Sequence, residues 1–181
     1  MLDSLTIDNH RFRLVASADR IEDAVREVAA RINTDYADLN PLFISVLNGA
    51  YVFTADLLRH ITLPTHVSFI RLQSYEGMTS SGQVDFLVPL QVDISGRDII
   101  IIEDIVDSGL TMSFLKHYLL RKGAASVRIA SFVFKPDALR FPEAHPDYYG
   151  LSLPTSFLIG YGMDYTDGTC RNLPALFARE D

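Results

Sequence analysis

Residues 98–111 read Asp-Ile-Ile-Ile-Ile-Glu-Asp-Ile-Val-Asp-Ser-Gly-Leu-Thr. The four isoleucines predict a strand over residues 98–103, because a continuous β-branched run is typical of a central parallel strand covered on both faces. Two adjacent acids end this strand. A short loop then leads into a helix expected over residues 111–122, with Gly123 just beyond its end. Strand, loop and helix in this order indicate an α/β protein.

Strands and helices alternate along the rest of the chain. Apolar residues recur at helical spacing over residues 20–32, where Asp19 and Glu22 resemble a capping box. A second helix is expected over residues 50–60, with its inward side chains at Val52, Ala55, Leu57 and Leu58. Short apolar runs predict further strands over residues 42–47, 66–72, 84–88, 126–134 and 157–160. The alternation predicts a mostly parallel, twisted sheet flanked by helices.

The length of 181 residues suggests one domain over residues 1–181, since domains usually have about 100–200 residues. We expect a core over about residues 17–135 and a small lobe over about 136–181, which the N-terminal segment joins. The polar loop of residues 73–83 is rich in Ser, Thr and Gly, and loops of this length are usually functional or disordered.

The composition excludes several classes of protein. Sixteen Lys and Arg against 23 Asp and Glu give a formal charge of −7, which argues against a nucleic-acid partner. The single cysteine, Cys170, rules out an internal disulfide and fits a cytoplasmic location. The chain has no apolar run of about 18–20 residues and starts without a signal-peptide pattern, so we expect no membrane association.

The loop after the isoleucines has the features of a phosphate site. In an open α/β sheet, ligands bind beyond the carboxyl ends of the strands. Backbone N–H groups of this loop and of the helix N-terminus form an anion-binding cradle. Ser108 and Thr111 add hydroxyl groups, and Gly109 allows a close approach or a positive φ.

The acids Glu103 and Asp104 require a separate explanation, because they would repel a phosphate. Their carboxylate groups can accept hydrogen bonds from a ribose diol, or they can bind Mg²⁺ directly or through water. Alternatively, Asp107 or Ser108 is only a helix N-cap and the two acids are solvated. The segment contains neither a Walker A loop nor a GxGxxG motif.

Residues Glu103 to Thr111 resemble the phosphoribosyl pyrophosphate signature of the type I phosphoribosyltransferases. More of the chain resembles one branch of this family, the hypoxanthine phosphoribosyltransferases of purine salvage. The matching segments run in the same order from about residue 40 to 175. Residues 46–57 resemble the first active-site loop and helix, and residues 70–75 and 79–82 resemble the lid. Lys135-Pro136 resembles the purine-contacting lysine, and residues 146–148, 157–165 and 171–174 resemble the hood and C-terminus.

The resemblance implies the type I phosphoribosyltransferase fold, with a flexible lid loop and a small hood lobe. It also implies transfer of a 5-phosphoribosyl group from phosphoribosyl pyrophosphate to N9 of hypoxanthine or guanine, with release of pyrophosphate. A purine carbonyl accepts a hydrogen bond from a buried lysine, whereas the amino group of adenine does not. A lysine at this position therefore favours a 6-oxopurine over adenine as the substrate. The resemblance further suggests a homodimer or homotetramer.

The family pattern implies a role for individual residues. The residues implied to bind the 5-phosphate are Asp107, Ser108, Gly109, Leu110 and Thr111. Asp107 is also implied to be the base near purine N7. Glu103 and Asp104 are implied for the ribose diol and a first Mg²⁺, and Asp164 for a second. The residues implied to contact the purine are Lys135, Phe157, Leu158 and Asp164. Those implied to contact the pyrophosphate are Asn48, Gly49 and Arg171, and those implied in the lid are Ser74 and Tyr75.

The chain departs from the family pattern at two places. The first loop often carries Leu-Lys-Gly, but here it reads Leu47-Asn48-Gly49, so a lysine charge is missing. The family often has a cis peptide bond at this point, and we expect one between Leu47 and Asn48. One extra residue separates Asp164 from Arg171, and either Arg171 or Arg140 is the candidate for the pyrophosphate contact.

Two other classes of function use the same fold. A regulatory protein senses phosphoribosyl pyrophosphate and binds nucleic acid, but it needs a basic face or an added module. A structural subunit binds ribose phosphate without turnover. The acidic charge and the presence of Asp107, Lys135 and Asp164 favour the enzyme. The order of preference among hypoxanthine, guanine and xanthine stays open.

Overall fold

The computed structural model describes residues 3–74, 84–166 and 168–180. Its larger sheet has the strand order β5-β4-β3-β6-β7-β8. All neighbours in this sheet pair in parallel except β4 and β5, which are antiparallel. The strands are β3 (Leu42–Leu47), β4 (His66–Ser74), β5 (Val84–Val88), β6 (Asp98–Val106), β7 (Ser126–Phe134) and β8 (Tyr148–Ser152).

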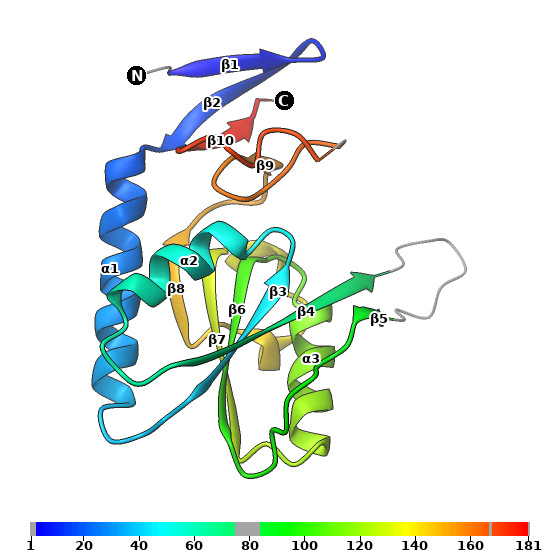
Figure 1. Ribbon diagram of the computed structural model, residues 1–181. Helices are drawn as coiled ribbons and strands as arrows, with labels where there is room; N and C mark the ends of the chain where they lie inside the picture. The colour runs from blue at the N-terminus through cyan, green and yellow to red at the C-terminus, as the bar shows by residue number, and fades with distance from the viewer. Residues whose placement is uncertain (1–2, 75–83, 167, 181) are drawn as a thin grey trace.

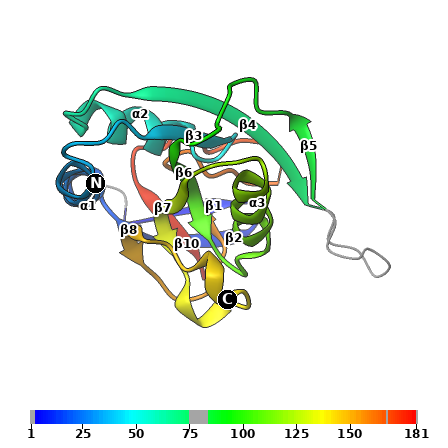
Figure 2. The ribbon, with the colours of Figure 1, turned by 90° about the horizontal axis from the view of Figure 1, so that it is seen from below.

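Helices cover both faces of this sheet (Figures 1 and 2). Helices α1 (Ala18–Asp35) and α2 (Tyr51–His60) lie on one face, and α3 (Leu110–Arg121) lies on the other. Two short 3-10 turns, η1 (Pro136–Ala138) and η2 (Pro142–Ala144), follow β7. Among the described residues, none of the helices is long and apolar enough to cross a membrane.

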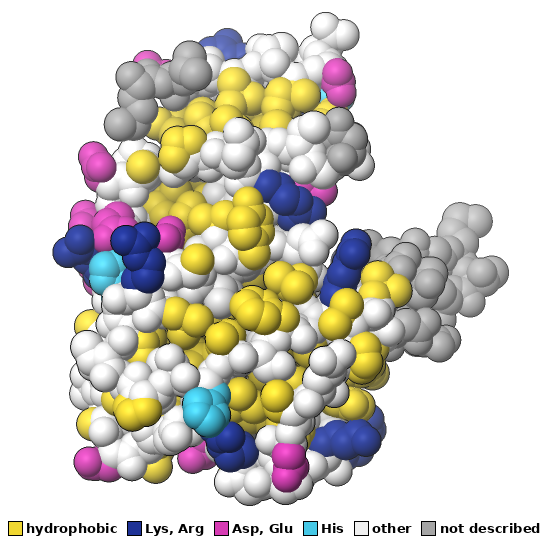
Figure 3. Space-filling view, viewed as in Figure 1, with side chains coloured by type: hydrophobic (Ala, Val, Ile, Leu, Met, Phe, Trp, Pro, Cys, Tyr) yellow, Lys and Arg dark blue, Asp and Glu magenta, His cyan; other side chains and the backbone are white. Residues whose placement is uncertain are grey.

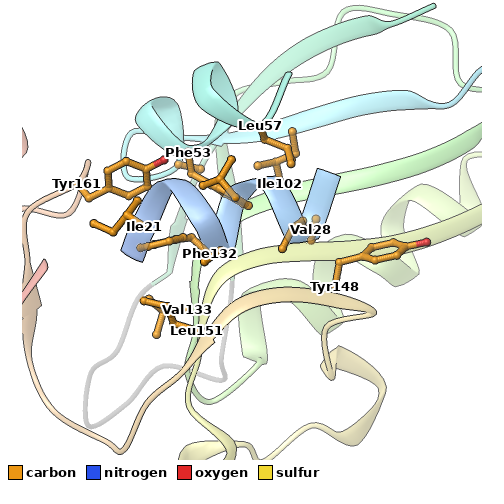
Figure 4. Packing of buried hydrophobic residues seen from close by; sticks show 14 of the residues in the cluster. Ile21, Val28, Phe53, Leu57, Ile102, Phe132, Val133, Tyr148, Leu151 and Tyr161 are labelled. Atoms are coloured by element: carbon orange, nitrogen blue, oxygen red, sulfur yellow. The ribbon is translucent and has the colours of Figure 1, made fainter. Parts of the chain in front are cut away.

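The four isoleucines of β6 are completely buried, which explains their continuous run. Ile100 and Ile102 point into the cluster formed with α1 and α2, whereas Ile99 and Ile101 point into the cluster formed with α3. Figure 4 shows Ile102 in the first of these clusters. The parallel α/β sheet predicted from this run is therefore confirmed.

The structure corrects the predicted end of this strand. We expected β6 to end at Glu103, but it continues to Val106, because Ile105 and Val106 pair with Val133 and Phe134 of β7. The two acids therefore lie within the strand, and the loop before α3 is shorter than expected.

The predicted helices are present, with two corrections in detail. Ser17 caps α1 by accepting a hydrogen bond from the Arg20 N–H, so the capping box expected at Asp19 is wrong. In α2, Phe53 and Thr54 are buried with Leu57, whereas Ala55 is exposed. Thr54 was not predicted to be buried because it is polar. Its hydroxyl forms a 2.7 Å hydrogen bond with the hydroxyl of buried Ser45.

A second, antiparallel sheet forms the upper lobe in Figure 1, here called the hood. It joins the two ends of the chain, since its order is β1-β2-β10-β9. The strands are β1 (Ser4–Ile7), β2 (His10–Ala16), β10 (Leu176–Arg179) and β9 (Leu158–Ile159). Phe12, Ile159 and Phe177 form its small core. Strand β8 lies in the range expected for the hood, but it pairs with β7 in the large sheet.

Truncating a side chain in the centre of β6 tests the claim that two-sided burial stabilises the fold. Ile101→Ala is expected to lower the free energy of unfolding by about 2–5 kcal/mol, because it removes buried methyl groups and leaves a cavity. Leu120→Ala is the control, since Leu120 on α3 is 43% exposed and should change stability by less than about 0.5 kcal/mol. Chemical denaturation measures both values, and equal losses would contradict the account.

Candidate active site

The loop between β6 and α3 encloses a cavity of about 170 Å³, lined by residues 103 and 105–112. Gly109 has a φ of +84° and precedes the first residue of α3, whose N-terminus therefore faces this cavity. A Cβ at Gly109 would also come within 2.9 Å of Leu139 and Ala144, so both the conformation and the close packing require glycine. The structure thus places the residues predicted to bind phosphate, 107–111, around one recess.

The segment after β7 supports this loop from behind. The backbone N–H groups of Arg140 and Phe141 donate to the Ser108 carbonyl at 2.9 and 3.3 Å. Arg140 is thereby tied to the phosphate loop through its backbone, and its side chain is exposed. Arg171, the other candidate for the pyrophosphate contact, lies next to Asp164 instead.

Glu103 and Asp104 are partly buried neighbours that contact different parts of the site. Glu103 lines the cavity of the loop between β6 and α3, and no described residue forms a hydrogen bond with its buried Oε2. Asp104 contacts the first loop at Gly49. Its carboxyl group lies so close to this glycine that an added Cβ would overlap it.

Burial raises the pKa of Glu103 well above its usual range, and the adjacent Asp104 charge adds to the shift. Burial also raises the pKa of Asp104, against the opposing hydrogen bond from the Ile105 N–H at 2.9 Å. Two close carboxyl groups with an unpartnered oxygen fit a divalent cation, whose charge would favour both ionised forms. In the described part of the chain, no group of three or more His, Cys, Asp or Glu side chains could hold a metal.

Lys135 and Asp107 meet at the mouth of the phosphate loop. Lys135 follows directly after β7, is only 5% exposed, and donates from Nζ to Asp107 Oδ2 at 2.9 Å. Asp107 is half exposed, with 51% of its side chain accessible. A buried cation is costly without a partner, so Asp107 accounts for the burial of this lysine. Lys135 is therefore not a solvated residue at a strand end.

The first loop passes between Asp104 and the hood. The expected cis peptide bond between Leu47 and Asn48 is confirmed. Gly49 lies with its backbone against Asp104 on one side and against Gly162 on the other, where a Cβ on Gly162 would overlap the Gly49 carbonyl oxygen. Only backbone fits at Gly49, so this residue contributes its peptide groups alone.

Asp164 and Arg171 form an ion pair beside this loop. Arg171 Nη2 lies 2.8 Å from Asp164 Oδ1, and Nη1 donates to the Gly162 carbonyl at 2.6 Å. The guanidinium is close enough to Asp104 to lower the pKa of that carboxyl group, although burial outweighs this effect. The structure therefore brings Arg171, Asp164, Asp104 and the first loop together.

The remaining predicted residues lie in the hood and the lid. Phe157 is 45% exposed and packs edge-on against Tyr165, whereas Leu158 is buried in β9. Ser74 is the last residue of β4. Tyr75 and the rest of the expected lid, up to residue 83, lie outside the described residues. In Figure 3, a notch separates the hood from the core below it.

Sequence reasoning assigned no role to Tyr161 and Asp56, which join the hood to the core. Tyr161 Oη donates to Asp56 Oδ2 at 2.8 Å across 105 residues of sequence. The Gly160-Tyr161-Gly162 run was a usable signal, because two glycines around one residue indicate positive φ values. All three residues do have positive φ.

Comparisons with known proteins agree with this geometry. A family profile described as a phosphoribosyl transferase domain matches residues 15–166. The hypoxanthine-guanine phosphoribosyltransferase of Bacillus subtilis (strain 168) is 39% identical over 163 residues, covering 90% of this chain and 89% of that protein. The enzyme of the same name from Streptococcus agalactiae serotype V is 37% identical over 169 residues, covering 93% of each.

Solved structures give the same result. The crystal structure of a hypoxanthine-guanine phosphoribosyltransferase from Bacillus anthracis has a TM-score of 0.86 and 33% identity, covering 91% of this chain and 96% of that one. A hypoxanthine phosphoribosyltransferase from Trypanosoma cruzi has a TM-score of 0.85 and 37% identity, covering 92% and 94%. The chain therefore belongs to the phosphoribosyltransferase family and, within it, to the hypoxanthine-guanine phosphoribosyltransferases.

Proposed function

We propose that this protein is a purine-salvage enzyme that transfers the 5-phosphoribosyl group of phosphoribosyl pyrophosphate to N9 of hypoxanthine or guanine. The products are IMP or GMP and pyrophosphate. The observation that carries the proposal is the pair formed by buried Lys135 and Asp107 at 2.9 Å, directly at the phosphate loop. This pair places a hydrogen-bond donor and a proton acceptor side by side, next to the anion-binding recess.

Lys135 and Asp107 divide the recognition of the base between them. The Lys135 ammonium donates to the 6-oxo group of the purine, a partner that the amino group of adenine does not provide. Asp107 accepts the proton at N7 as N9 attacks the sugar. Phe157 stacks on the base with its exposed ring, the backbone at Leu158 reads the edge of the base, and Asp164 lies beside it.

The phosphate loop holds the 5-phosphate. Residues 107–111 supply the N–H groups at the start of α3, while Ser108 and Thr111 contribute their hydroxyl groups. Glu103 and Asp104 accept hydrogen bonds from the ribose hydroxyls. At the other end of the substrate, the peptide groups of Asn48 and Gly49 meet the pyrophosphate together with the Arg171 guanidinium.

Glu103 and Asp104 are the residues that hold Mg²⁺, and Asp164 holds a second ion. Two carboxylates fit Mg²⁺ because this ion usually takes its remaining ligands from substrate phosphates and water. Bound Mg²⁺ supplies a Lewis acid that stabilises charge on the leaving pyrophosphate. The buried, unpartnered Glu103 Oε2 and the raised pKa of both carboxyl groups support this assignment.

The proposal extends to the surroundings of the enzyme. The segment 73–83, with Ser74 and Tyr75, acts as a lid that excludes water from the site, so that the purine attacks the sugar. The protein is cytoplasmic and forms a homodimer or homotetramer. The single cysteine supports the first statement, and family membership supports the second.

Incubating the protein with phosphoribosyl pyrophosphate, Mg²⁺ and one purine base at a time tests this function. Hypoxanthine and guanine are expected to give IMP and GMP with one pyrophosphate per nucleotide, because Lys135 needs a 6-oxo acceptor. Adenine is expected to react at least about 10²-fold more slowly. Chromatography of the products measures the nucleotide formed from each base. If no base gives a nucleotide, the proposed enzyme activity is wrong, and if only adenine reacts, the 6-oxopurine assignment is wrong.

Replacing the acid by its amide at position 107 tests the proposed base. Asp107→Asn keeps an acceptor for Lys135 but cannot take a proton at N7. We expect kcat to fall by about 10²-fold or more, with a much smaller change in KM for phosphoribosyl pyrophosphate.

Asp23→Asn is the matched control, because Asp23 is exposed on α1, and its steady-state kinetics should equal those of the wild type. An unchanged kcat in Asp107→Asn would remove Asp107 from the proton transfer.

A further inference from the structure

The hood turn 160–163 and the segment 171–173 behave as one unit. Tyr161 N–H donates to the Leu173 carbonyl and Gly162 N–H to the Arg171 carbonyl, both at 2.9 Å. The Arg171 side chain closes the unit by donating to the Gly162 carbonyl at 2.6 Å. A movement of the turn therefore moves the Arg171 guanidinium with it.

The first loop and α2 form a second unit. Gly49 lies two residues before Tyr51, the first residue of α2, and Tyr51 N–H donates to the Asn48 carbonyl at 3.2 Å. The position of Gly49 therefore follows that of α2. The two units meet where Gly162 packs against the Gly49 carbonyl.

Tyr161 connects the two units. Its side chain is 5% exposed, and its ring centroid lies 4.6 Å from that of Phe132 in β7. Figure 4 shows the ring beside Ile21 and Phe53, at one end of the buried cluster. The hydroxyl donates to Asp56 on α2 at 2.8 Å. Burial raises the pKa of Tyr161, which keeps this hydroxyl protonated as a donor.

A cavity lies beside the connection between the two units. The cavity measures about 420 Å³ and lies between α1, α2 and the segment 171–174, with Tyr161, Asp56 and Arg171 in its wall. The Tyr161–Asp56 hydrogen bond is a direct side-chain link between the two units, in addition to the packing of Gly162 on Gly49.

We infer that Tyr161 and Asp56 are positioning residues for the pyrophosphate end of the site. Their hydrogen bond fixes the distance between the Arg171 guanidinium and the peptide groups of Asn48 and Gly49. Neither side chain touches the substrate. This inference rests on the proposed function, because it assumes that these groups bind pyrophosphate.

Tyr161→Phe removes the hydroxyl and keeps the ring. We expect KM for phosphoribosyl pyrophosphate to rise about tenfold, while KM for hypoxanthine and kcat change less than about twofold. Calorimetry with phosphoribosyl pyrophosphate and Mg²⁺ should show the same loss in Kd. Since calorimetry does not depend on turnover, it tests the inference even if the proposed reaction fails.

Variants at position 56 separate positioning from a general loss of stability. Asp56→Asn keeps an acceptor for the Tyr161 hydroxyl and should retain a KM near that of the wild type. Asp56→Leu lacks the acceptor and should match Tyr161→Phe. The double variant Tyr161→Phe with Asp56→Leu should be no worse than either single change, because both remove the same hydrogen bond.

Tyr148→Phe is the matched control. Its hydroxyl donates to Asp35 at 2.6 Å, also from a buried tyrosine, at the opposite end of the cluster in Figure 4. It should lower the melting temperature and leave every KM unchanged. Wild-type KM and Kd in Tyr161→Phe, or an equal KM increase in Tyr148→Phe, would overturn the inference.

Discussion

The burial of β6 on both faces determines where the polar residues of this protein lie. Its isoleucines alternate between the cluster under α1 and α2 and the cluster under α3, so that stretch of the strand has no room for charge. Charged residues of β6 lie at its two ends, at Asp98 and after Ile102, outside the part that the helices cover on both faces. Glu103, Asp104, Asp107 and Ser108 follow in sequence at the carboxyl end, and the ligand site of an open α/β sheet lies at this edge.

The other end of the site depends on backbone packing. Gly49 lies between the Asp104 carboxyl group and Gly162, at distances that exclude a Cβ on either glycine. The resemblance to the family predicts a lysine in this loop, and this chain has the uncharged Asn48 instead. Arg171 lies near this loop, and its ion pair with Asp164 orients it. The missing lysine charge at position 48 is thus accompanied by a nearby arginine held from the hood.

Sequence patterns predicted those parts of the fold that depend on local burial. The β6 run and the range of β3 needed only neighbouring residues. The predicted start of α1 was wrong because β2 ends at Ala16, where it pairs with Leu176 of β10. This long-range pairing makes Ser17 the cap of the helix. Strand β8 went unpredicted because it is an edge strand with an irregular burial pattern. The Tyr161–Asp56 contact spans 105 residues, which no local pattern can reveal.

The central claim is that buried Lys135, held by Asp107, selects a 6-oxopurine. The most direct measurement is the ratio of kcat/KM for hypoxanthine to that for adenine in the wild type and in Lys135→Met, which keeps the length of the side chain without its charge. The account predicts that kcat/KM for hypoxanthine falls by about 10²-fold, since a charged hydrogen bond is lost, while the rate with adenine does not fall. A wild-type ratio in Lys135→Met would contradict it.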